Sequence, residues 1–275
     1  MDQLRIMQAQ IKVPSDKNEL PLLLESLLKT AAENKADMLT LPEMFCCPYQ
    51  SSLFPVYAEP EGGFVYSLCA GLAKKYNIYL SAGTMPESEA GKIYNTAYVF
   101  DRKGIQIARH RKMHMFDINI KNGQSFRESD TLCPGNSVTV FDTEFGKMGI
   151  CVCFDFRFPE LGRLMAAGGA RLVLCPASFN FTTGPAHWEL MFRAEAMFNQ
   201  YYAIGTAPAL DNRASYHSWG HSIAVNPWGD VMCQMGTEEG IQVVELDLKE
   251  TESVRAQLPL LNNRRTDIYS LTKLK

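Results

Sequence analysis

Apolar and polar residues follow two alternating periodicities along the chain, one typical of strands and one typical of helices. Residues 4–13 are apolar with Gln8 and Gln10 interleaved, which predicts a strand. Residues 18–34 carry leucines at three- and four-residue spacing, which predicts an amphipathic helix, and Pro21 falls in its tolerant first turn. The alternation of strands and helices continues to the end of the chain and indicates an α/β layered fold.

The same patterns predict most of the remaining elements. Further strands are expected over residues 36–41, 78–83, 93–101, 105–110, 149–153, 172–175, 202–206, 221–226, 231–235 and 241–246. Further helices are expected over residues 60–76, 160–167 and 186–200. Short turns join 93–101 to 105–110 and 221–226 to 231–235, so both pairs are expected to form hairpins.

Length and composition favour a single domain. The 275 residues are 46% hydrophobic and 21% charged, which is enough to bury a large core. No linker, repeat or low-complexity tract interrupts residues 1–275. The charged tail, residues 249–275, is poor core material. Its leucine cluster at residues 258–261 is expected to form an arm that packs on a partner subunit or on its own domain.

Charge and cysteine spacing exclude several classes of protein. The net charge is −3 with scattered basic residues, so no nucleic-acid surface is expected. No apolar run reaches the length of roughly 18 residues needed to span a membrane, and no export signal is visible, so a soluble cytoplasmic protein is expected. The eight cysteines are expected to be reduced thiols. Neither Cys46-Cys47 nor Cys151-x-Cys153 has zinc-ligand spacing, so no metal site is expected.

One cysteine ends an apolar run at a position suited to a catalytic nucleophile. Cys153 closes the predicted strand 149–153, and Pro159 then opens the predicted helix 160–167. A thiol at such a strand-to-helix turn faces a cleft, and nearby helix-N-terminal N–H groups favour a thiolate and an oxyanion. The alternative is that Cys153 is a buried apolar cysteine, as most cysteines are.

Glu43 and Lys112 also follow predicted strands, where α/β sheets place their ligands. Glu43 could instead cap a helix, and Lys112 could be one more solvated charge. Together with Cys153 they would form a complete hydrolytic site. A carboxylate can take the thiol proton, and an ammonium can stabilise the thiolate and the tetrahedral intermediate.

Three segments resemble, in order and spacing, the signature segments of the nitrilase (carbon–nitrogen hydrolase) superfamily: residues 41–45, 111–117 and 153–161. The resemblance implies that Glu43 is the general base, Lys112 stabilises the oxyanion and Cys153 is the nucleophile. Glu128 matches the second glutamate of the family, which orients the lysine. The backbone N–H of Phe154 is the expected second oxyanion donor.

The resemblance also implies a fold, an assembly and a substrate class. It implies a four-layer α-β-β-α sandwich, a homodimer or larger homo-oligomer, and no cofactor. Residues 180–190, 218–222 and 226–229 look like the omega-amidase branch. Members of that branch hydrolyse the amide of small dicarboxylic acid monoamides, 2-oxoglutaramate and 2-oxosuccinamate.

Such a substrate needs a cation for its distal carboxylate, and arginine suits that role because it binds carboxylates through two parallel hydrogen bonds. Arg157 is the candidate, with Tyr49, Phe179 and Thr183 around it. The alternative is that Arg157 forms a structural ion pair with Asp155 or Glu160.

Three other functions stay open. A neighbouring branch of the family hydrolyses deaminated glutathione, a longer substrate that the loop 176–185 would have to accommodate. The chain could also be a catalytically silent binding protein, or a papain-like hydrolase using one of its five histidines. The four filled polar positions disfavour a silent protein. The cationic neighbours of His110 and His114 disfavour a papain-like site.

Overall fold

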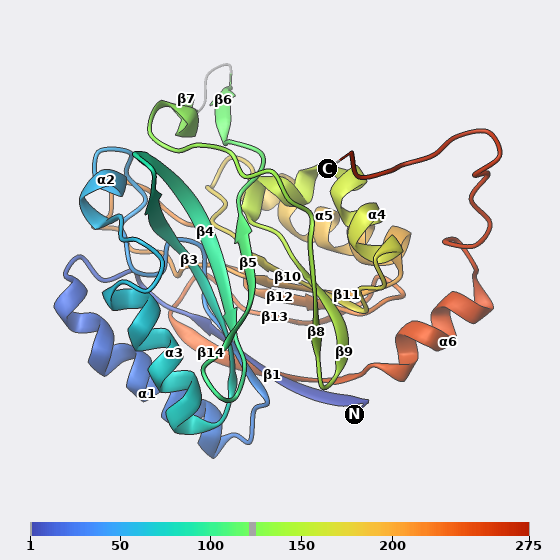
Figure 1. The fold of residues 1–275 in the computed structure, drawn as a ribbon, viewed down its shortest axis with the longest axis horizontal. Coiled ribbons are helices and arrows are strands. Elements are labelled where there is room, and N and C mark those ends of the chain that lie inside the picture. The colour runs from blue at the N-terminus through green and yellow to red at the C-terminus, as the bar shows by residue number, and fades with distance from the viewer. Residues whose placement is uncertain (1, 121–124, 275) are drawn as a thin grey trace.

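The computed structural model describes residues 2–120 and 125–274. Two six-stranded sheets pack face to face with helices on their outer faces (Figure 1). The first sheet contains, in spatial order, β14 (Gly240–Asp247), β1 (Gln3–Gln10), β2 (Met38–Thr40), β3 (Tyr79–Glu89), β4 (Lys92–Phe100) and β5 (Gln106–Arg111). The second contains β13 (Val231–Gln234), β12 (Ile223–Val225), β11 (Tyr202–Thr206), β10 (Leu172–Pro176), β9 (Gly146–Ile150) and β8 (Thr139–Thr143).

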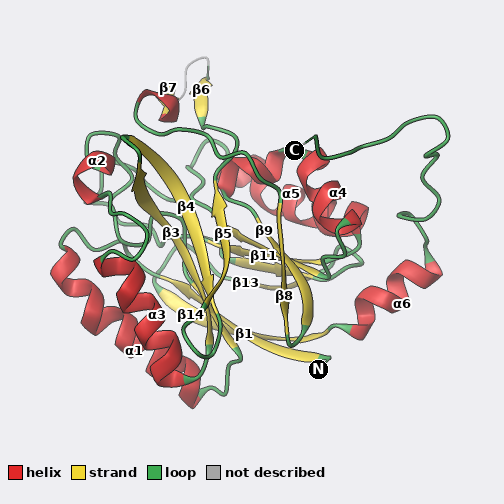
Figure 2. Ribbon diagram, in the orientation of Figure 1, coloured by secondary structure: helices red, strands yellow, loops and turns green. Residues whose placement is uncertain are grey.

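Helices cover the two outer faces, as Figure 2 shows. Helices α1 (Leu20–Glu33) and α3 (Phe64–Tyr76) lie on the first sheet, and α4 (Pro159–Ala167) and α5 (Gly184–Asn199) lie on the second. The shorter elements are α2 (Phe54–Tyr57), α6 (Lys249–Gln257), the paired strands β6 (Asp117–Asn119) and β7 (Ser125–Arg127), and the 3-10 turns Lys17–Glu19, Glu128–Asp130 and Cys153–Arg157.

Strand β1 shows why the sequence forms layers. Leu4 and Ile6 belong to the core that includes the second sheet, whereas Met7 and Ala9 belong to the core formed with α1 and α3. Successive side chains of a strand point to opposite faces, so a strand that is apolar on both faces needs a cover on each side. The four-layer arrangement satisfies that requirement, and the expected fold class is confirmed.

Polar bridges join the two sheets where strands end. The side chain of Gln8 donates to the carbonyl of Gly205 at 2.8 Å and to the hydroxyl of Thr206 at 3.1 Å. The Thr40 and Thr206 hydroxyls are 2.7 Å apart. All of these groups are buried, so each bridge satisfies polar atoms that would otherwise be costly to bury. The bridges fix the relative position of the strand ends that carry the site.

Several predicted elements are confirmed, including both hairpins, which pair in antiparallel fashion as β4–β5 and β12–β13. The predicted end of the strand 78–83 is wrong, because β3 continues through Pro86 to Glu89. The register shifts between Ser81 and Thr84, where Gly83 has a φ of +51°. This bulge absorbs the irregular sequence. Beyond Ser81, β2 no longer pairs with β3, and the Pro86 carbonyl instead accepts from the backbone N–H of Glu59 at 3.2 Å.

The predicted strand 149–153 is also shifted. Strand β9 ends at Ile150 and pairs with β8, a strand that the sequence pattern did not reveal. Cys153 is therefore the first residue of the turn Cys153–Arg157 rather than the last residue of a strand. The strand-to-helix position of the thiol is preserved, because α4 begins soon after this turn.

The tail begins on its own domain. Thr251 and Val254 of α6 are buried, and Arg255 donates to the carbonyls of Gln200 and Ala170 at 3.1 and 2.8 Å. Farther along, Leu261 packs against the core while Ile268 is exposed. The arm therefore leaves the domain only after its first helix.

Candidate active site

The four predicted catalytic residues meet in the interior between the sheets. Glu43 follows β2, Lys112 directly follows β5, Glu128 opens the turn Glu128–Asp130, and Cys153 follows β9. Glu43, Lys112 and Glu128 are 0% exposed, and Cys153 is 4% exposed. Side chains separated by more than a hundred residues are thus brought into one water-poor cluster, where electrostatic interactions are strong.

Lys112 lies between the two glutamates. Its Nζ is 3.0 Å from Glu43 Oε1 and 2.8 Å from Glu128 Oε2. The side-chain amide of Asn95 donates to Glu43 Oε1 at 2.8 Å and more weakly to Glu128 Oε1 at 3.4 Å. The other oxygen of Glu43 accepts from the backbone N–H of Ser178 at 2.8 Å. These contacts fix Glu43 in place, close enough to Cys153 for each group to shift the pKa of the other.

The charges of the cluster are set by burial and by each other. Burial raises the pKa of Glu43, Lys112 lowers it and Glu128 raises it, with a net increase. Burial and Glu43 raise the pKa of the Cys153 thiol well above its ordinary value, although Lys112 opposes them. Burial disfavours the Lys112 ammonium, but the two carboxylates raise its pKa well above the ordinary value. The resting cluster therefore contains a thiol, a basic carboxylate and a permanent ammonium.

The backbone at the nucleophile is strained. Cys153 has a φ of +47°, and Met44, directly after Glu43, has a φ of +52°. Residues with side chains rarely adopt this left-handed region, and it is seen where surrounding structure holds a functional group in place. The backbone conformation at Cys153 therefore directs the thiol away from the sheet and toward Glu43.

Cys151, two residues earlier, has different surroundings. Burial, followed by the nearby Cys175 on β10, raises the pKa of the Cys151 thiol well above the ordinary value. Neither Glu43 nor Lys112 contacts it among the residues that the structure describes. Of the two thiols, Cys153 has both a base and a cation beside it.

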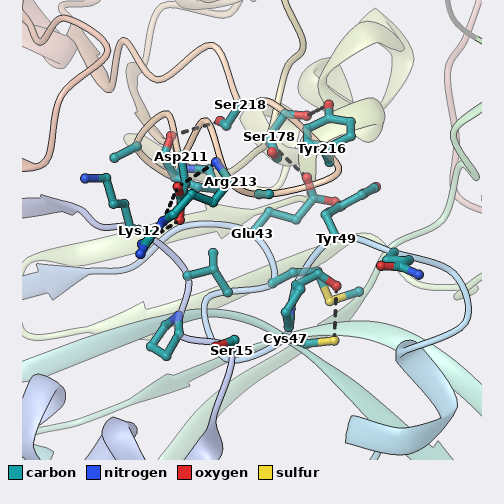
Figure 3. Close-up of a pocket in the computed structure, with 18 of the residues that line it drawn as sticks. Lys12, Ser15, Glu43, Cys47, Tyr49, Ser178, Asp211, Arg213, Tyr216 and Ser218 are labelled. Atoms are coloured by element: carbon teal, nitrogen blue, oxygen red, sulfur yellow. Dashed lines mark hydrogen bonds and ion pairs between the residues drawn. The ribbon is translucent and has the colours of Figure 1, made fainter.

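A cavity of about 1000 Å³ reaches the cluster. Figure 3 shows Glu43, Tyr49, Ser178 and Tyr216 close together in its wall, with charged residues such as Arg213 gathered farther away. The Ser178 carbonyl accepts from the Tyr216 hydroxyl at 2.7 Å and from the Cys153 thiol at 3.9 Å. Glu43, Ser178 and Tyr216 line the cavity whereas Cys153 does not, and Ser178 connects the cavity wall to the thiol.

Tyr49 connects the wall of the cavity to the catalytic cluster. Its hydroxyl donates to Glu128 Oε1 at 3.2 Å. Its ring packs against Tyr216, with ring centroids 4.8 Å apart, and meets Phe54 edge to face. Tyr49 is therefore held rigidly at the point where a ligand would approach the two glutamates.

Arg157 lies near the thiol without a carboxylate partner. Its guanidinium is 4.5 Å from the ring centroid of Phe179, and its Nη1 is 3.1 Å from His187 Nδ1. Its Nε is buried without a hydrogen bond, and burial lowers the pKa of the guanidinium although Cys153 opposes this. In the described part of the chain neither Asp155 nor Glu160 pairs with it, and it does not line the large cavity.

Thr183 has a structural contact of its own. Its backbone N–H and its hydroxyl both donate hydrogen bonds to Asn180 Oδ1, at 2.8 and 3.1 Å. Thr183 precedes α5, so this contact orders the start of that helix. Phe179 packs edge to face on Trp188 with ring centroids 5.0 Å apart, and the guanidinium of Arg157 lies over its ring.

Sequence patterns did not reveal three residues of the site. Asn95 is one polar residue within a strand and gave no signal of its role. Ser178 and Tyr216 lie in loops, and only the position of Ser178 two residues past β10 marked it as a strand-end residue. Their roles depend on contacts between distant segments.

No helix among residues 2–120 and 125–274 is long and apolar enough to cross a membrane. Within the same ranges, no group of three or more histidine, cysteine and acidic side chains is arranged to hold a metal ion.

A buried thiol beside a basic carboxylate and an ammonium, at the strand ends of a double-sheet α/β fold, defines a cysteine-dependent hydrolase. The sequence profile of the carbon-nitrogen hydrolase family matches residues 3–256. The chain belongs to that family, as the signature segments indicated.

Two relatives and one solved structure show how similar the chain is to known proteins. The omega-amidase NIT2 of Mus musculus is 43% identical over 275 residues, and that of Homo sapiens is 42% identical over 275 residues, with 100% of each chain covered in both comparisons. The crystal structure of Saccharomyces cerevisiae Nit3, a member of branch 10 of the nitrilase superfamily, matches with a TM-score of 0.88 at 35% identity. That match covers 96% of this chain and 97% of the other.

Proposed function

We propose that this protein is an omega-amidase, which hydrolyses the amide of small dicarboxylic acid monoamides such as 2-oxoglutaramate and 2-oxosuccinamate. The observation that carries the proposal is the buried Cys153 thiol beside Glu43, with Lys112 bound to both Glu43 and Glu128. Membership of the carbon–nitrogen hydrolase family and full-length similarity to two omega-amidases support the substrate class.

The first half of the reaction forms a thioester. Glu43 takes the proton of Cys153 as the sulfur attacks the amide carbonyl. Lys112 and the backbone N–H of Phe154 stabilise the oxyanion, and a preorganised donor of this kind contributes about 3 kcal/mol in other enzymes. Glu43 then gives its proton to the leaving nitrogen, the carbon–nitrogen bond breaks, and ammonia departs.

The second half releases the acid. Glu43 takes a proton from a water molecule, whose oxygen attacks the thioester carbonyl. The carbon–sulfur bond breaks, and the proton on Glu43 returns to the sulfur. Glu128 keeps Lys112 directed at the reacting carbonyl throughout, because Lys112 is bonded to Glu128 and Glu43 at once.

Arg157 is the proposed partner of the distal carboxylate of the substrate. The guanidinium of Arg157 is half-buried, its Nε is buried without a hydrogen bond, and a ligand carboxylate would supply the missing partner. Phe179 and His187 hold the guanidinium in place. Tyr49, Phe179 and Thr183 are proposed as the wall around this subsite.

The protein is further proposed to be a cytoplasmic homodimer or larger homo-oligomer. The apolar side chains exposed on the C-terminal arm support this, since Ile268 is 68% and Tyr269 57% exposed. Partner subunits would bury these side chains. The cytoplasmic location rests on the reduced thiols expected of a chain of this size.

The deciding experiment measures ammonia release from 2-oxoglutaramate by the wild type and by Cys153→Ala. Rapid turnover that disappears in the variant is expected. Substantial residual turnover in Cys153→Ala would move the nucleophile to Cys151 or elsewhere.

Deaminated glutathione and a simple nitrile are tested in parallel. For deaminated glutathione the release of cysteinylglycine is measured, because cleavage of its amide frees that dipeptide rather than ammonia. The large cavity beside Glu43 gives room for a longer leaving group, which makes deaminated glutathione the second candidate substrate. Preferential turnover of deaminated glutathione would replace the proposed substrate. A folded wild type that turns over none of these compounds would favour a binding protein instead.

A further inference from the structure

The carboxylate of Asp155 is buried and accepts five hydrogen bonds. Its Oδ1 accepts from the backbone N–H groups of Met113 and His114 at 3.0 and 2.9 Å, and from His114 Nδ1 at 2.8 Å. Its Oδ2 accepts from the backbone N–H of Val152 at 3.1 Å and from His110 Nε2 at 2.9 Å. The side chain is 0% exposed, so water does not compete for these bonds.

The donors bracket two residues of the catalytic cluster. His110 and Met113 lie on either side of Lys112, two residues before it and one after it. Val152 and Asp155 itself lie on either side of Cys153. One carboxylate therefore joins the segment that carries the ammonium, at the end of β5 in the first sheet, to the turn that carries the thiol, after β9 in the second sheet.

The charge of Asp155 makes this junction strong. Burial alone would raise the pKa of its carboxyl group, but the hydrogen bonds from His110 and His114 hold that pKa below its ordinary value. An ionised carboxylate only accepts, so both imidazoles act as donors toward it. Hydrogen bonds to an ionised acceptor are roughly twice as strong as neutral ones.

Neighbouring contacts leave the junction little freedom. The other ring nitrogen of His110 is 3.0 Å from the hydroxyl of Thr139 on β8. The ring of His114 stacks on Phe158, with centroids 3.6 Å apart and an interplanar angle of 12°. Phe158 ends the turn that begins at Cys153, so both imidazoles are fixed to the second sheet as well as to Asp155.

We infer that Asp155 is a positioning residue, which fixes the Lys112 ammonium relative to the Cys153 sulfur without contacting the substrate. Two features of the site require such a device. Cys153 holds a left-handed backbone that needs support from its surroundings, and Lys112 reaches the thiol from the opposite sheet. A misplacement of about 1 Å in a catalytic group can cost about 100-fold in rate.

Asp155→Asn tests this inference with little change in shape. The new amide group keeps one accepting oxygen, but an N–H₂ group replaces the other. That N–H₂ group faces N–H groups that now donate to Asp155, and a backbone N–H cannot become an acceptor. Ammonia release by the full chain is expected to fall about 100-fold in kcat, with KM little changed. Loss of folded protein would instead lower the active concentration and leave the properties of the remaining sites unchanged.

Alkylation of Cys153 by iodoacetamide, followed across pH by peptide mass spectrometry, supplies a readout that a merely structural role would not move. Lys112 lowers the pKa of the Cys153 thiol, so displacement of Lys112 should shift the midpoint of alkylation to higher pH. This readout needs no substrate. It therefore tests the positioning of Lys112 even if the proposed omega-amidase activity, on which the kcat measurement rests, is absent.

Two further variants complete the experiment. Asp142→Asn removes an exposed carboxylate that pairs with Lys147, and is expected to behave as wild type. His114→Phe keeps a ring against Phe158 but removes one donor to Asp155, and is expected to shift kcat and the alkylation midpoint in the same directions by smaller amounts. If Asp155→Asn does not fold, the measurements on His114→Phe test the positioning role of Asp155 instead. Wild-type kcat with an unchanged alkylation midpoint in a folded variant would overturn the inference, as would a loss of activity without any shift of the midpoint.

Discussion

Glu43 and Glu195 are both buried glutamates, and in both burial raises the pKa of the carboxyl group above its ordinary value. Glu195 lies on α5 close to Gly162 of α4, where a side chain would collide with its Oε2. That oxygen accepts from Asn199 Nδ2 at 2.8 Å and from the Tyr201 hydroxyl at 2.9 Å. Burial raises its pKa to about 7, although these hydrogen bonds and the nearby charge of Arg163 lower it.

The difference between the two lies in their neighbours. Glu43 contacts a cation, a thiol and a cavity, whereas Glu195 contacts a phenol and an amide and forms no ion pair within the described parts of the chain. A perturbed pKa is frequent at active sites but also arises wherever a carboxyl group is buried. A buried carboxyl group becomes a base for catalysis when a nucleophile and an opening accompany it. Exchanging each glutamate for glutamine tests that distinction.

Glu43→Gln should have the largest effect. The amide keeps the shape of the side chain but cannot take the proton of Cys153, and general-base catalysis contributes about 10² to 10⁴-fold. We expect kcat for ammonia release to fall by about 10³-fold with a smaller change in KM. Near-wild-type turnover would mean that another group accepts the thiol proton.

Glu128→Gln should have an intermediate effect. Lys112 loses one of its two carboxylate partners but keeps Glu43, so its ammonium becomes less well directed while the base remains. Loss of a residue that orients a catalytic group costs about 10- to 100-fold in activity. Steady-state kinetics beside Glu43→Gln provide the measurement. A loss as large as that of Glu43→Gln would assign Glu128 a part in proton transfer.

Glu195→Gln should leave kcat unchanged and alter only the pH dependence of stability. Folding raises the pKa of Glu195 from 4.5 to about 7, so the folded protein keeps a proton that the unfolded chain releases between these values. The wild type therefore loses stability as pH rises through that range, by at most about 3 kcal/mol.

Urea unfolding at pH values from about 5 to about 8 measures this loss. The glutamine variant cannot ionise at this position, so its free energy of unfolding should fall less across the range. Equal slopes in the two proteins would show that Glu195 does not titrate there, and lowered kcat in the variant would connect α5 to the catalytic site.

The catalytic residues could be predicted because their signals are local. Glu43 and Lys112 follow predicted strands and Cys153 ends one, and their types supply a base, a cation and a nucleophile. The signature segments of the family added Glu128, which no periodicity marks. The roles of these four residues remain part of the proposal, while the family itself is shown.

The supporting residues could not be predicted, because their roles depend on segments that only the fold brings together. Asn95 reaches Glu43 and Glu128 from β4, and Asp155 receives donors from a segment more than forty residues earlier in the sequence. Errors in strand ends have a similar origin. A bulge carries β3 past its predicted end, and the pairing of β9 with β8 fixes where β9 stops.

The pairing of β1 with β14 ties the two ends of the domain together, since Leu4 lies opposite Leu246. During synthesis on a ribosome, β1 emerges more than two hundred residues before its partner β14. Until then, one edge of the first sheet presents unpaired backbone groups that can recruit strands from other nascent chains. Completion of the sheet must therefore await the synthesis of β14. A chain truncated before Gly240 would be exposed to aggregation even though it contains every residue of the catalytic cluster.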